Sequence, residues 1–199
     1  VERDSGRNGC ARGAPAEGST VRDARHILSD AGAHWLAGLL AHAPGMTALC
    51  TPTINGFGRF RPNALAPQHI LWGRDNRGAM LRVVGAAGDP ATRIENRIGE
   101  PAANPYLYIA SQIHAGLDGL LRGLEPPPAT DSPYAAGPAR LPDNLGDALA
   151  ALRADDALLN GLGAPVVEHF CRIKQSEIDR HSDAKDKTDF ERREYLSRY

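Results

Sequence analysis

Cysteine is scarce in this sequence. The 199 residues contain three, Cys10, Cys50 and Cys171, and no two of them stand in a C-x-x-C pair. An odd number of widely spaced cysteines does not fit the disulfide framework of a small secreted protein or the paired thiols of a redox motif. We therefore predict reduced thiols and a cytoplasmic protein.

The sequence also lacks a long apolar run and a net charge of one sign. Lys and Arg total 23 against 24 Asp and Glu, a formal net charge of -1, so strong attraction to nucleic acid or to a membrane surface is not expected. No apolar run approaches the ~20 residues of a membrane-spanning helix, and the first residues lack the apolar core of a signal peptide. Neither nucleic acid nor a membrane is a predicted partner.

The middle of the chain contains a run of charges at alternating positions. Arg93, Glu95 and Arg97 alternate with uncharged residues. Because side chains alternate between the faces of a strand, a strand here places two guanidiniums and one carboxylate on one face. Guanidiniums bind phosphate and carboxylate oxygens, and a carboxylate among arginines stays ionised. The run predicts a site for an anionic substrate and a divalent cation; the alternative is a solvated sheet surface with weak ion pairs.

Four sequence blocks resemble the C-terminal catalytic half of the glutamine synthetase family. They are N-[SG]-[YF]-x-R-[LFY]-x-P-x-x-x-A-P at Asn55–Pro67, N-R-x-x-x-[IL]-R at Asn76–Arg82, R-x-E-x-R at Arg93–Arg97 and A-N-P-Y-L at Ala103–Leu107. Each block alone is a weak signal, but four in the family's order are specific. The resemblance covers nearly all of this chain and about the second half of a family member.

The resemblance implies an α+β fold. It would comprise antiparallel strands of part of a glutamine-synthetase-type catalytic barrel, backed by several helices, with a helical C-terminal part. Residues 1–199 would form the C-terminal portion of the catalytic domain, without the N-terminal β-grasp domain and the first half of the catalytic domain. Since the sequence also begins without Met, we expect a fragment or a truncated gene product. The family's rings imply a homo-oligomer for the full-length form.

The resemblance also implies an ATP-dependent ligase with magnesium or manganese as its metal. In the family, ATP phosphorylates the γ-carboxylate of glutamate, and ammonia or another amine then displaces the phosphate. Such phosphoryl transfer depends on positioning and on charge stabilisation. By position, the resemblance assigns Arg59 and Arg97 to substrate glutamate and Glu95 to a metal ion. It assigns Arg77, Arg82 and Arg93 to the nucleotide, and the first two of these also to catalysis.

One position departs from the ammonia-using members of the family. They carry a glutamate two residues before the last proline of the first block, and this chain has Leu65 there. Leucine cannot act as the general base that deprotonates ammonium. Relatives with an apolar residue there look like γ-glutamyl ligases for organic amines such as polyamines or aniline. We therefore expect an organic amine as the nucleophile, with ammonia the less favoured choice.

A catalytically incomplete homologue with a binding or assembly role is the competing hypothesis. The family's H-x-H strand and its earlier metal-binding glutamates have no counterpart in the sequence. One metal-binding carboxylate cannot hold two or three cations. We therefore expect this polypeptide alone to lack ligase activity, whichever hypothesis holds.

Local patterns predict the secondary structure around these blocks. A helix should begin at Ser19 or Thr20 and end at Pro44; its histidines, eight residues apart, suit surface or capping roles better than a metal site. Residues 68–73 and 79–84 read as two strands that could form a hairpin around a turn at 75–78. A third strand covers 93–97, preceded by a turn at 85–89.

The second half of the chain reads as mainly helical. Asn104 and Pro105 form a helix start, and the apolar stripe of that helix is expected to be buried: Ile109, Ile113, Leu117, Leu120 and Leu121. A loop should cover 125–140. Further helices are expected up to residue 152, over 154–162, over 166–181 and from 190 to the end, with Lys174 and Glu177 paired on a helix surface.

Overall fold

The computed structural model of the chain describes residues 24–61, 64, 66–135 and 139–196. Its elements in chain order are η2 (Ala24–His26), α1 (Asp30–Ala41), α2 (Ala43–Cys50), η3 (Asn55–Arg59), β1 (Trp72–Arg74), β2 (Leu81–Val84), β3 (Arg93–Asn96), α3 (Pro105–Arg122), α4 (Leu145–Arg153), α5 (Asp156–Leu162), α6 (Ala164–Asp183), α7 (Lys187–Glu191) and the π-helical turn η4 (Arg192–Leu196). The predicted α+β class is confirmed.

The three strands form one small sheet in the order β1-β2-β3. β2 and β3 are antiparallel, as the family resemblance implies, but β1 and β2 are parallel, so the predicted hairpin is wrong. Between β1 and β2 the chain reverses direction twice, because the two strands are parallel. In this connection Asp75 has a φ of 45°, and the Asn76 side chain accepts a hydrogen bond from the Gly78 amide at 3.0 Å. That turn is local, as predicted, but it brings the chain back beside the start of β1.

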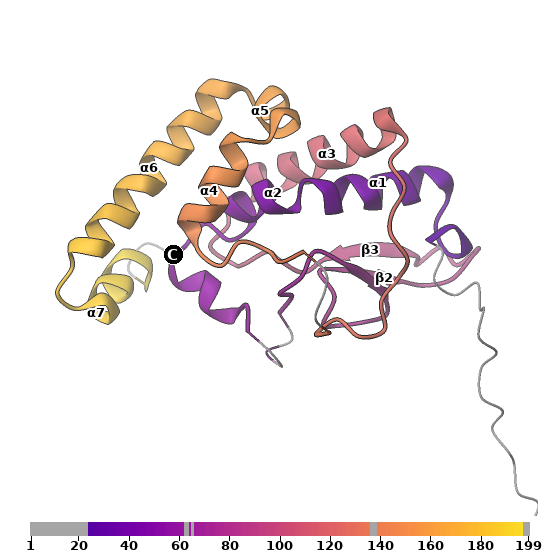
Figure 1. Cartoon of the computed structure of the whole chain (residues 1–199), viewed down its shortest axis with the longest axis horizontal. Helices are drawn as coiled ribbons and strands as arrows, with labels where there is room; N and C mark the ends of the chain where they lie inside the picture. The colour runs from indigo at the N-terminus through magenta and orange to yellow at the C-terminus, as the bar shows by residue number, and fades with distance from the viewer. Residues whose placement is uncertain (1–23, 62–63, 65, 136–138, 197–199) are drawn as a thin grey trace, which may run out of the picture.

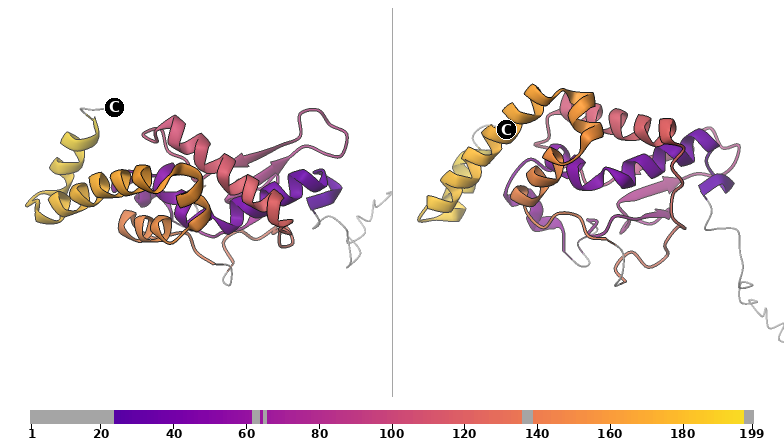
Figure 2. Two further views of the ribbon diagram at one scale, coloured as in Figure 1. Left: turned by 90° about the horizontal axis from the view of Figure 1, so that it is seen from above. Right: turned by 45° about the horizontal axis from the view of Figure 1, so that its top comes forward.

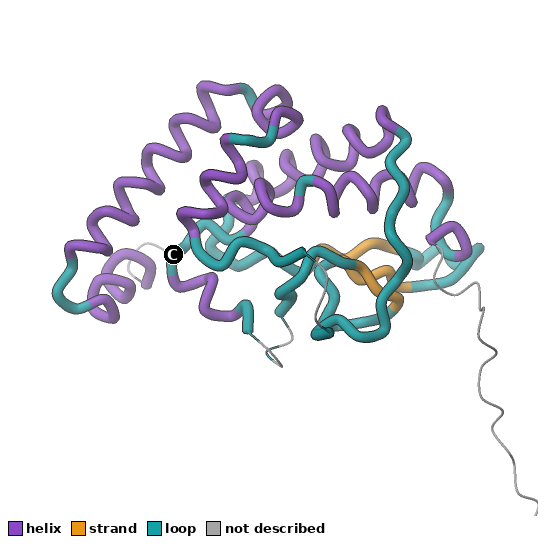
Figure 3. Tube along the Cα trace, viewed as in Figure 1, coloured by secondary structure: helices purple, strands orange, loops and turns teal. Residues whose placement is uncertain are grey.

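One face of the sheet packs against helices, and the other carries charge. Leu81 and Val83 of β2 are fully buried in the core that continues into α1–α3. In Figure 1 these three helices lie above the strands, and the two views of Figure 2 agree. Figure 3 shows that the chain below the strands is mainly loop. Arg82, between the two buried residues, points to the opposite face, where charged residues of β3 also lie.

α1 and α3 pack through glycine rather than through large apolar side chains. A Cβ on Gly38 would lie 2.1 Å from the Ala115 carbonyl oxygen, and one on Gly119 would lie 2.2 Å from the His34 carbonyl oxygen. Helices this close have no room for leucine or isoleucine between them. The predicted burial of the α3 stripe is therefore wrong for the four residues that the structure leaves exposed: Ile109, Ile113, Leu117 and Leu121.

The helix ends follow local signals, though not always the predicted ones. Asn104 caps α3 as expected: its side chain accepts hydrogen bonds from the amides of Tyr106 and Leu107. α1 begins later than predicted, with Ser29 as its cap, and the predicted caps Ser19 and Thr20 lie outside the described residues. Pro44 does not end a helix but occupies the first turn of α2, where a missing N–H costs nothing.

The C-terminal third is helical, as predicted. Asn144 and Asp155 cap α4 and α5 through their side chains, and α6 runs from Ala164 to Asp183. Lys174 and Glu177 pair at 2.9 Å, but both are buried rather than on the helix surface. The described part of 125–140 forms no helix, which agrees with the predicted loop.

Among the described residues, no helix is long and apolar enough to span a bilayer.

Candidate functional site

A carboxylate between two guanidiniums is the centre of the charged sheet face. The antiparallel register places Arg82 of β2 directly opposite Glu95 of β3, so both side chains lie on one face. Arg82 Nη1 donates to Glu95 Oε2 at 3.0 Å, and Arg97 Nη1 donates to Glu95 Oε1. On its other side, Arg82 Nε donates to Asp75 Oδ1 at 3.0 Å. The structure therefore brings together three of the predicted site residues.

The arginines keep Glu95 ionised. Burial alone would raise the pKa of this carboxyl, but the hydrogen bonds and positive charges of Arg97 and Arg82 outweigh it, and the pKa lies below its ordinary value. The prediction of an ionised carboxylate among arginines is consistent with this direction. Since both oxygens already accept hydrogen bonds from guanidiniums, Glu95 is part of a charge network rather than a free anion.

Arg59 joins this group through the backbone that follows β3. It is the last residue of η3, and its Nη2 donates to the carbonyl of Ile98, one residue beyond Arg97. Its Nε is buried without a hydrogen-bond partner among the described residues. Burial lowers its pKa, and the guanidinium lies 5.2 Å from the Phe60 ring centre. A half-buried cation with an unused N–H suits an anionic ligand.

Arg77 and Arg93 lie outside this network. Arg77 is exposed in the turn after β1, and its charge contributes to lowering the pKa of Asp75. Arg93 is exposed at the start of β3, where its Nη1 donates to the Ala91 carbonyl at 3.0 Å. Both side chains are open to solvent, so they are placed to meet a ligand from outside rather than to fix the geometry of the centre.

Glu100, whose carboxylate feels the charge of Arg59, was not singled out from the sequence. It follows β3, and its Oε1 accepts hydrogen bonds from the Thr53 amide at 2.9 Å and the Thr53 hydroxyl at 2.8 Å. It also lines a pocket of about 400 Å³ with Asn96 and Tyr108. Burial raises its pKa, although the Thr53 donors and the charge of Arg59 oppose that rise. A glutamate between Gly99 and Pro101, next to the R-x-E-x-R block, was the available signal.

The described residues do not by themselves fit a divalent cation. No group of three or more His, Cys, Asp or Glu side chains in the described ranges could hold a metal ion. Glu95 offers one carboxylate, and hard cations such as Mg²⁺ require several oxygen ligands. Leu65, the position that bears on the choice of amine, lies outside the described residues.

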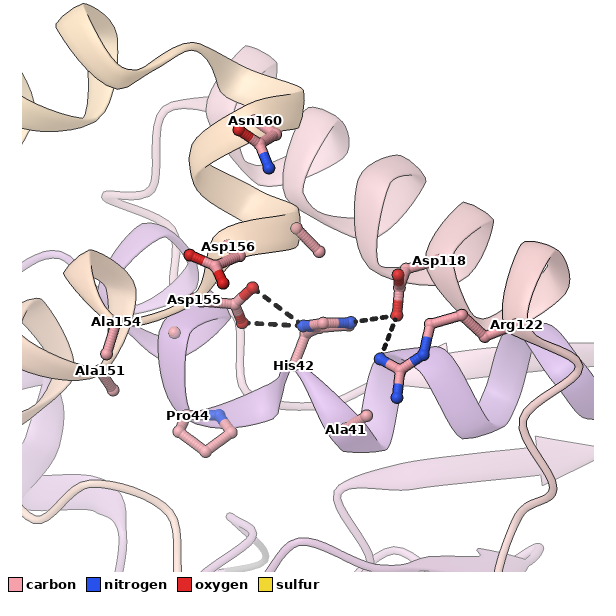
Figure 4. A pocket seen from close by; sticks show the side chains of 12 residues that line it. Ala41, His42, Pro44, Asp118, Arg122, Ala151, Ala154, Asp155, Asp156 and Asn160 are labelled. Carbon is pink, nitrogen blue, oxygen red and sulfur yellow. Dashed lines mark hydrogen bonds and ion pairs between the residues drawn. The ribbon is translucent and has the colours of Figure 1, made fainter.

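A second polar cluster lies among the helices, away from the sheet. His42, between α1 and α2, is hydrogen-bonded through Nδ1 to Asp155 at 2.8 Å and through Nε2 to Asp118 at 2.9 Å, and Arg122 Nη1 donates to Asp118 at 2.9 Å (Figure 4). These residues line a pocket of about 590 Å³. His42 stands at the cap position between α1 and α2, as expected, although its side chain is buried and makes no capping hydrogen bond.

Known proteins that resemble this chain share one family. The model of the glutamine synthetase catalytic domain matches residues 18–195. The chain is 43% identical to γ-glutamylanilide synthase of an Acinetobacter species, over 79% of this chain and 32% of that relative. It is 39% identical to glutamine synthetase of Thermus thermophilus, over 79% of this chain and 37% of that relative. It is 41% identical to glutamate–methylamine ligase of Methyloversatilis universalis, over 75% of this chain and 36% of that relative.

Solved structures give the same result. Two structures titled GmaS, an ADP complex and a ligand-free form, each superpose with a TM-score of 0.71 at 33% and 36% sequence identity. The matches cover 85% of this chain and 40% and 39% of those chains. The chain thus spans about a third of the length of the curated relatives it matches. It belongs to the glutamine synthetase family and matches that family's catalytic domain.

Proposed function

We propose that this chain is part of an ATP-dependent ligase that joins the γ-carboxylate of glutamate to an organic amine through a γ-glutamyl phosphate. The observation that carries the proposal is the Arg82–Glu95–Arg97 network, with Arg59 beside it, in a chain of the glutamine synthetase family. These side chains are the ones that the family blocks match. In this proposal residues 1–199 form the C-terminal portion of the catalytic domain.

Each arginine has a role that its placement supports. Arg59 and Arg97 bind the carboxylate groups of glutamate, since their guanidiniums are less exposed than those of Arg77 and Arg93 and are fixed by hydrogen bonds to Ile98 and Glu95. Arg82, tied to Asp75 and Glu95, stabilises the negative charge that develops on the transferred phosphoryl group. Exposed Arg77 and Arg93 contact the nucleotide phosphates from the rim.

ATP would supply the phosphoryl group, and magnesium or manganese would balance its charge. Glu95 is proposed as one ligand of such an ion. Because a single carboxylate held by two arginines does not complete a site for a hard cation, the remaining ligands would come from outside the described residues. The part that this chain performs by itself is to hold the glutamate carboxylates and to keep Glu95 ionised.

An organic amine is the proposed nucleophile. Leu65 replaces the acid that ammonia-using family members carry, and leucine offers an apolar contact instead of a base. One relative is named for a γ-glutamylanilide product and another for methylamine as a substrate, although a third is a glutamine synthetase. We therefore expect methylamine or aniline to be used in preference to ammonia. A homo-oligomer is proposed for the full-length form.

The chain alone is proposed to be inactive, and one assay tests both parts of the proposal. ADP and γ-glutamyl-amide formation are measured with glutamate, ATP, Mg²⁺ and methylamine, aniline or ammonia. The chain is tested alone and mixed with the portion of the Acinetobacter relative that precedes its matched region. We expect no turnover from either polypeptide alone and turnover from the mixture.

Glu95→Gln and Arg97→Lys variants identify the site. Both should abolish turnover in the mixture, whereas Glu168→Gln, at an exposed acid on α6, should leave it unchanged. Turnover by the chain alone would refute the predicted inactivity. A mixture that forms a stable complex yet makes no product would instead support the incomplete homologue with a binding role.

A further inference from the structure

We propose that Glu100 is a positioning residue, which holds residues 51–56 against the end of β3 so that Arg59 keeps its place beside Arg97. The inference rests on the proposed function, in which those two arginines bind glutamate. Glu100 itself is not proposed to touch the substrate. It acts through Thr53, whose amide and hydroxyl both donate to its carboxylate.

The carboxylate and Thr53 form a closed set of hydrogen bonds. Oε1 of Glu100 accepts from the Thr53 amide at 2.9 Å, and the Thr53 hydroxyl lies 2.8 Å and 3.0 Å from the two carboxylate oxygens. The same hydroxyl oxygen accepts a hydrogen bond from the Gly56 amide at 3.1 Å. Glu100 is therefore connected to the first turn of η3, the short helix that ends at Arg59.

Glycine at position 56 makes this approach possible. A Cβ built there would lie 2.1 Å from Oε2 of Glu100 and 2.8 Å from a methyl group of Thr51. No real side chain has contacts that short, so any larger residue would push the carboxylate or η3 aside. Gly56, in the first family block, and Glu100, after the third block, thus fit each other.

The backbones of the two segments are joined directly as well. The Glu100 amide donates to the Cys50 carbonyl at 3.0 Å, and the Thr51 hydroxyl donates to the Ile98 carbonyl at 2.6 Å. The Ile98 carbonyl also accepts from Arg59 Nη2. A shift of residues 51–56 would therefore change the geometry at the oxygen to which Arg59 is bound.

The same segment is also bound by the C-terminal part of the chain. The Tyr195 hydroxyl accepts a hydrogen bond from the Ile54 amide at 2.9 Å and donates to Glu177 of α6 at 2.5 Å. Lys174 donates to the other oxygen of Glu177 at 2.9 Å. The successive amides of Thr53 and Ile54 are thus bound by side chains from two different parts of the chain.

A purely structural role explains this arrangement less well. Burying a carboxylate is unfavourable, and apolar packing would stabilise the same contact without that cost. Glu100 lies close enough to Arg59 for its charge to oppose the effect of burial on that arginine. The carboxylate thus holds the segment and also favours the charged form of the side chain that the segment carries.

Chemical modification of Arg59 tests the inference without any turnover. The full chain is treated with phenylglyoxal, and the modification rate of each arginine is measured by peptide mass spectrometry. Arg61, exposed two residues later, is the internal control. Thr53→Val and Glu100→Gln should each raise the rate at Arg59 about fivefold, the factor expected for one hydrogen bond lost, and leave Arg61 unchanged.

Two further variants separate positioning from general stability. Thr53→Ser keeps both donors and should restore the parent rate. Asp118→Asn changes another half-buried acid, bound to His42 and Arg122 among the helices, and should leave Arg59 unchanged. Circular dichroism confirms that each variant is folded. An unchanged Arg59 rate in folded Thr53→Val, or an equal rise at Arg61, would overturn the inference.

This test and the ligase assay fail independently. The reagent reports only on the accessibility of Arg59, so a positive result stands even if the mixture in the ligase assay makes no product. Conversely, Glu95-dependent turnover would support the ligase even if Thr53→Val did not change the modification rate of Arg59. That second result would refute the positioning role alone.

Discussion

Replacing His42 by leucine should destabilise the protein by an amount that depends on pH. The imidazole connects α3 and the start of α5 to the junction of α1 and α2 through Asp118 and Asp155. Its side chain is 10% exposed, and those of the two acids are 21% and 11% exposed. The hydrogen bond to Asp155 raises the pKa of His42, burial opposes this, and Asp118 adds to the rise.

The magnitude follows from the two charge-assisted hydrogen bonds. Each contributes ~1.5–3 kcal/mol before the desolvation of the cation is subtracted, so their net contribution is about 2 kcal/mol. After the substitution, Asp118 still has Arg122 at 2.9 Å, and Asp155 still accepts from the Leu158 amide at 3.0 Å, which limits the loss. For a chain of this size, we expect a melting temperature lower by roughly 4–8 °C.

The pH dependence has a definite sign. The pKa of His42 is higher in the folded protein than in the unfolded chain, where it is 6.5. His42 therefore stabilises the folded state fully below pH 6.5, and this stabilisation is lost as pH rises through the folded pKa. At the acidic end, burial raises the pKa of Asp118, but hydrogen bonds from His42 and Arg122 outweigh it, and the pKa is lowered. The stability contributed by the ionised Asp118 carboxylate is therefore present above its unfolded pKa of 3.8, and it is lost as pH falls through its folded pKa.

Urea denaturation of the parent and His42→Leu at pH 5.5 and pH 9.0, followed by circular dichroism, measures the effect. The difference in unfolding free energy should be largest at pH 5.5 and should shrink at pH 9.0. His34→Leu, which removes from α1 an imidazole that is bound to the Leu124 carbonyl at 2.8 Å, controls for lost packing. A difference that is equal at both pH values would refute the reasoning.

Two further predictions concern the packing of α1 against α3. Gly38→Ala should lower the unfolding free energy by about 2 kcal/mol or more, because the new Cβ would lie 2.1 Å from the Ala115 carbonyl oxygen. This loss exceeds the gain from alanine's better helix propensity, and thermal denaturation measures it. Leu121→Gln, at a position 85% exposed on α3, should change that free energy by less than about 0.5 kcal/mol, and a loss as large as that of Gly38→Ala would contradict the observed packing.

Local signals predicted the elements whose causes are local. The helix start at Asn104 and Pro105 depends on hydrogen bonds made within three residues, and the strand at 93–96 depends on alternation that the sequence displays directly. The charged sheet face was predictable for the same reason. Its register was not, because the pairing of Arg82 with Glu95 depends on how two strands align.

The errors have a common physical origin in contacts between distant residues. Periodicity assigns large apolar side chains to the core, but α1 and α3 approach so closely that glycines such as Gly38 and Gly119 occupy the contact and the apolar stripe is left outside. His42 could not be placed because its two acids lie 76 and 113 residues further along the chain. Glu100 lay next to a recognised block, but its partner Thr53 is 47 residues away.

The charge on the sheet face is consistent with the proposed anion site in a nearly neutral chain. The chain as a whole has a formal charge of -1, so any positive field must be local. Glu95 is shared between two guanidiniums, and Asp75 is under the influence of Arg82, Arg77 and Arg74. The described arginines of this face, Arg82, Arg93 and Arg97, outnumber its carboxylates, Asp75 and Glu95, and the core cluster behind the sheet is built of apolar side chains. In the proposed function, the anionic groups of glutamate and of the nucleotide phosphates would supply the missing negative charge.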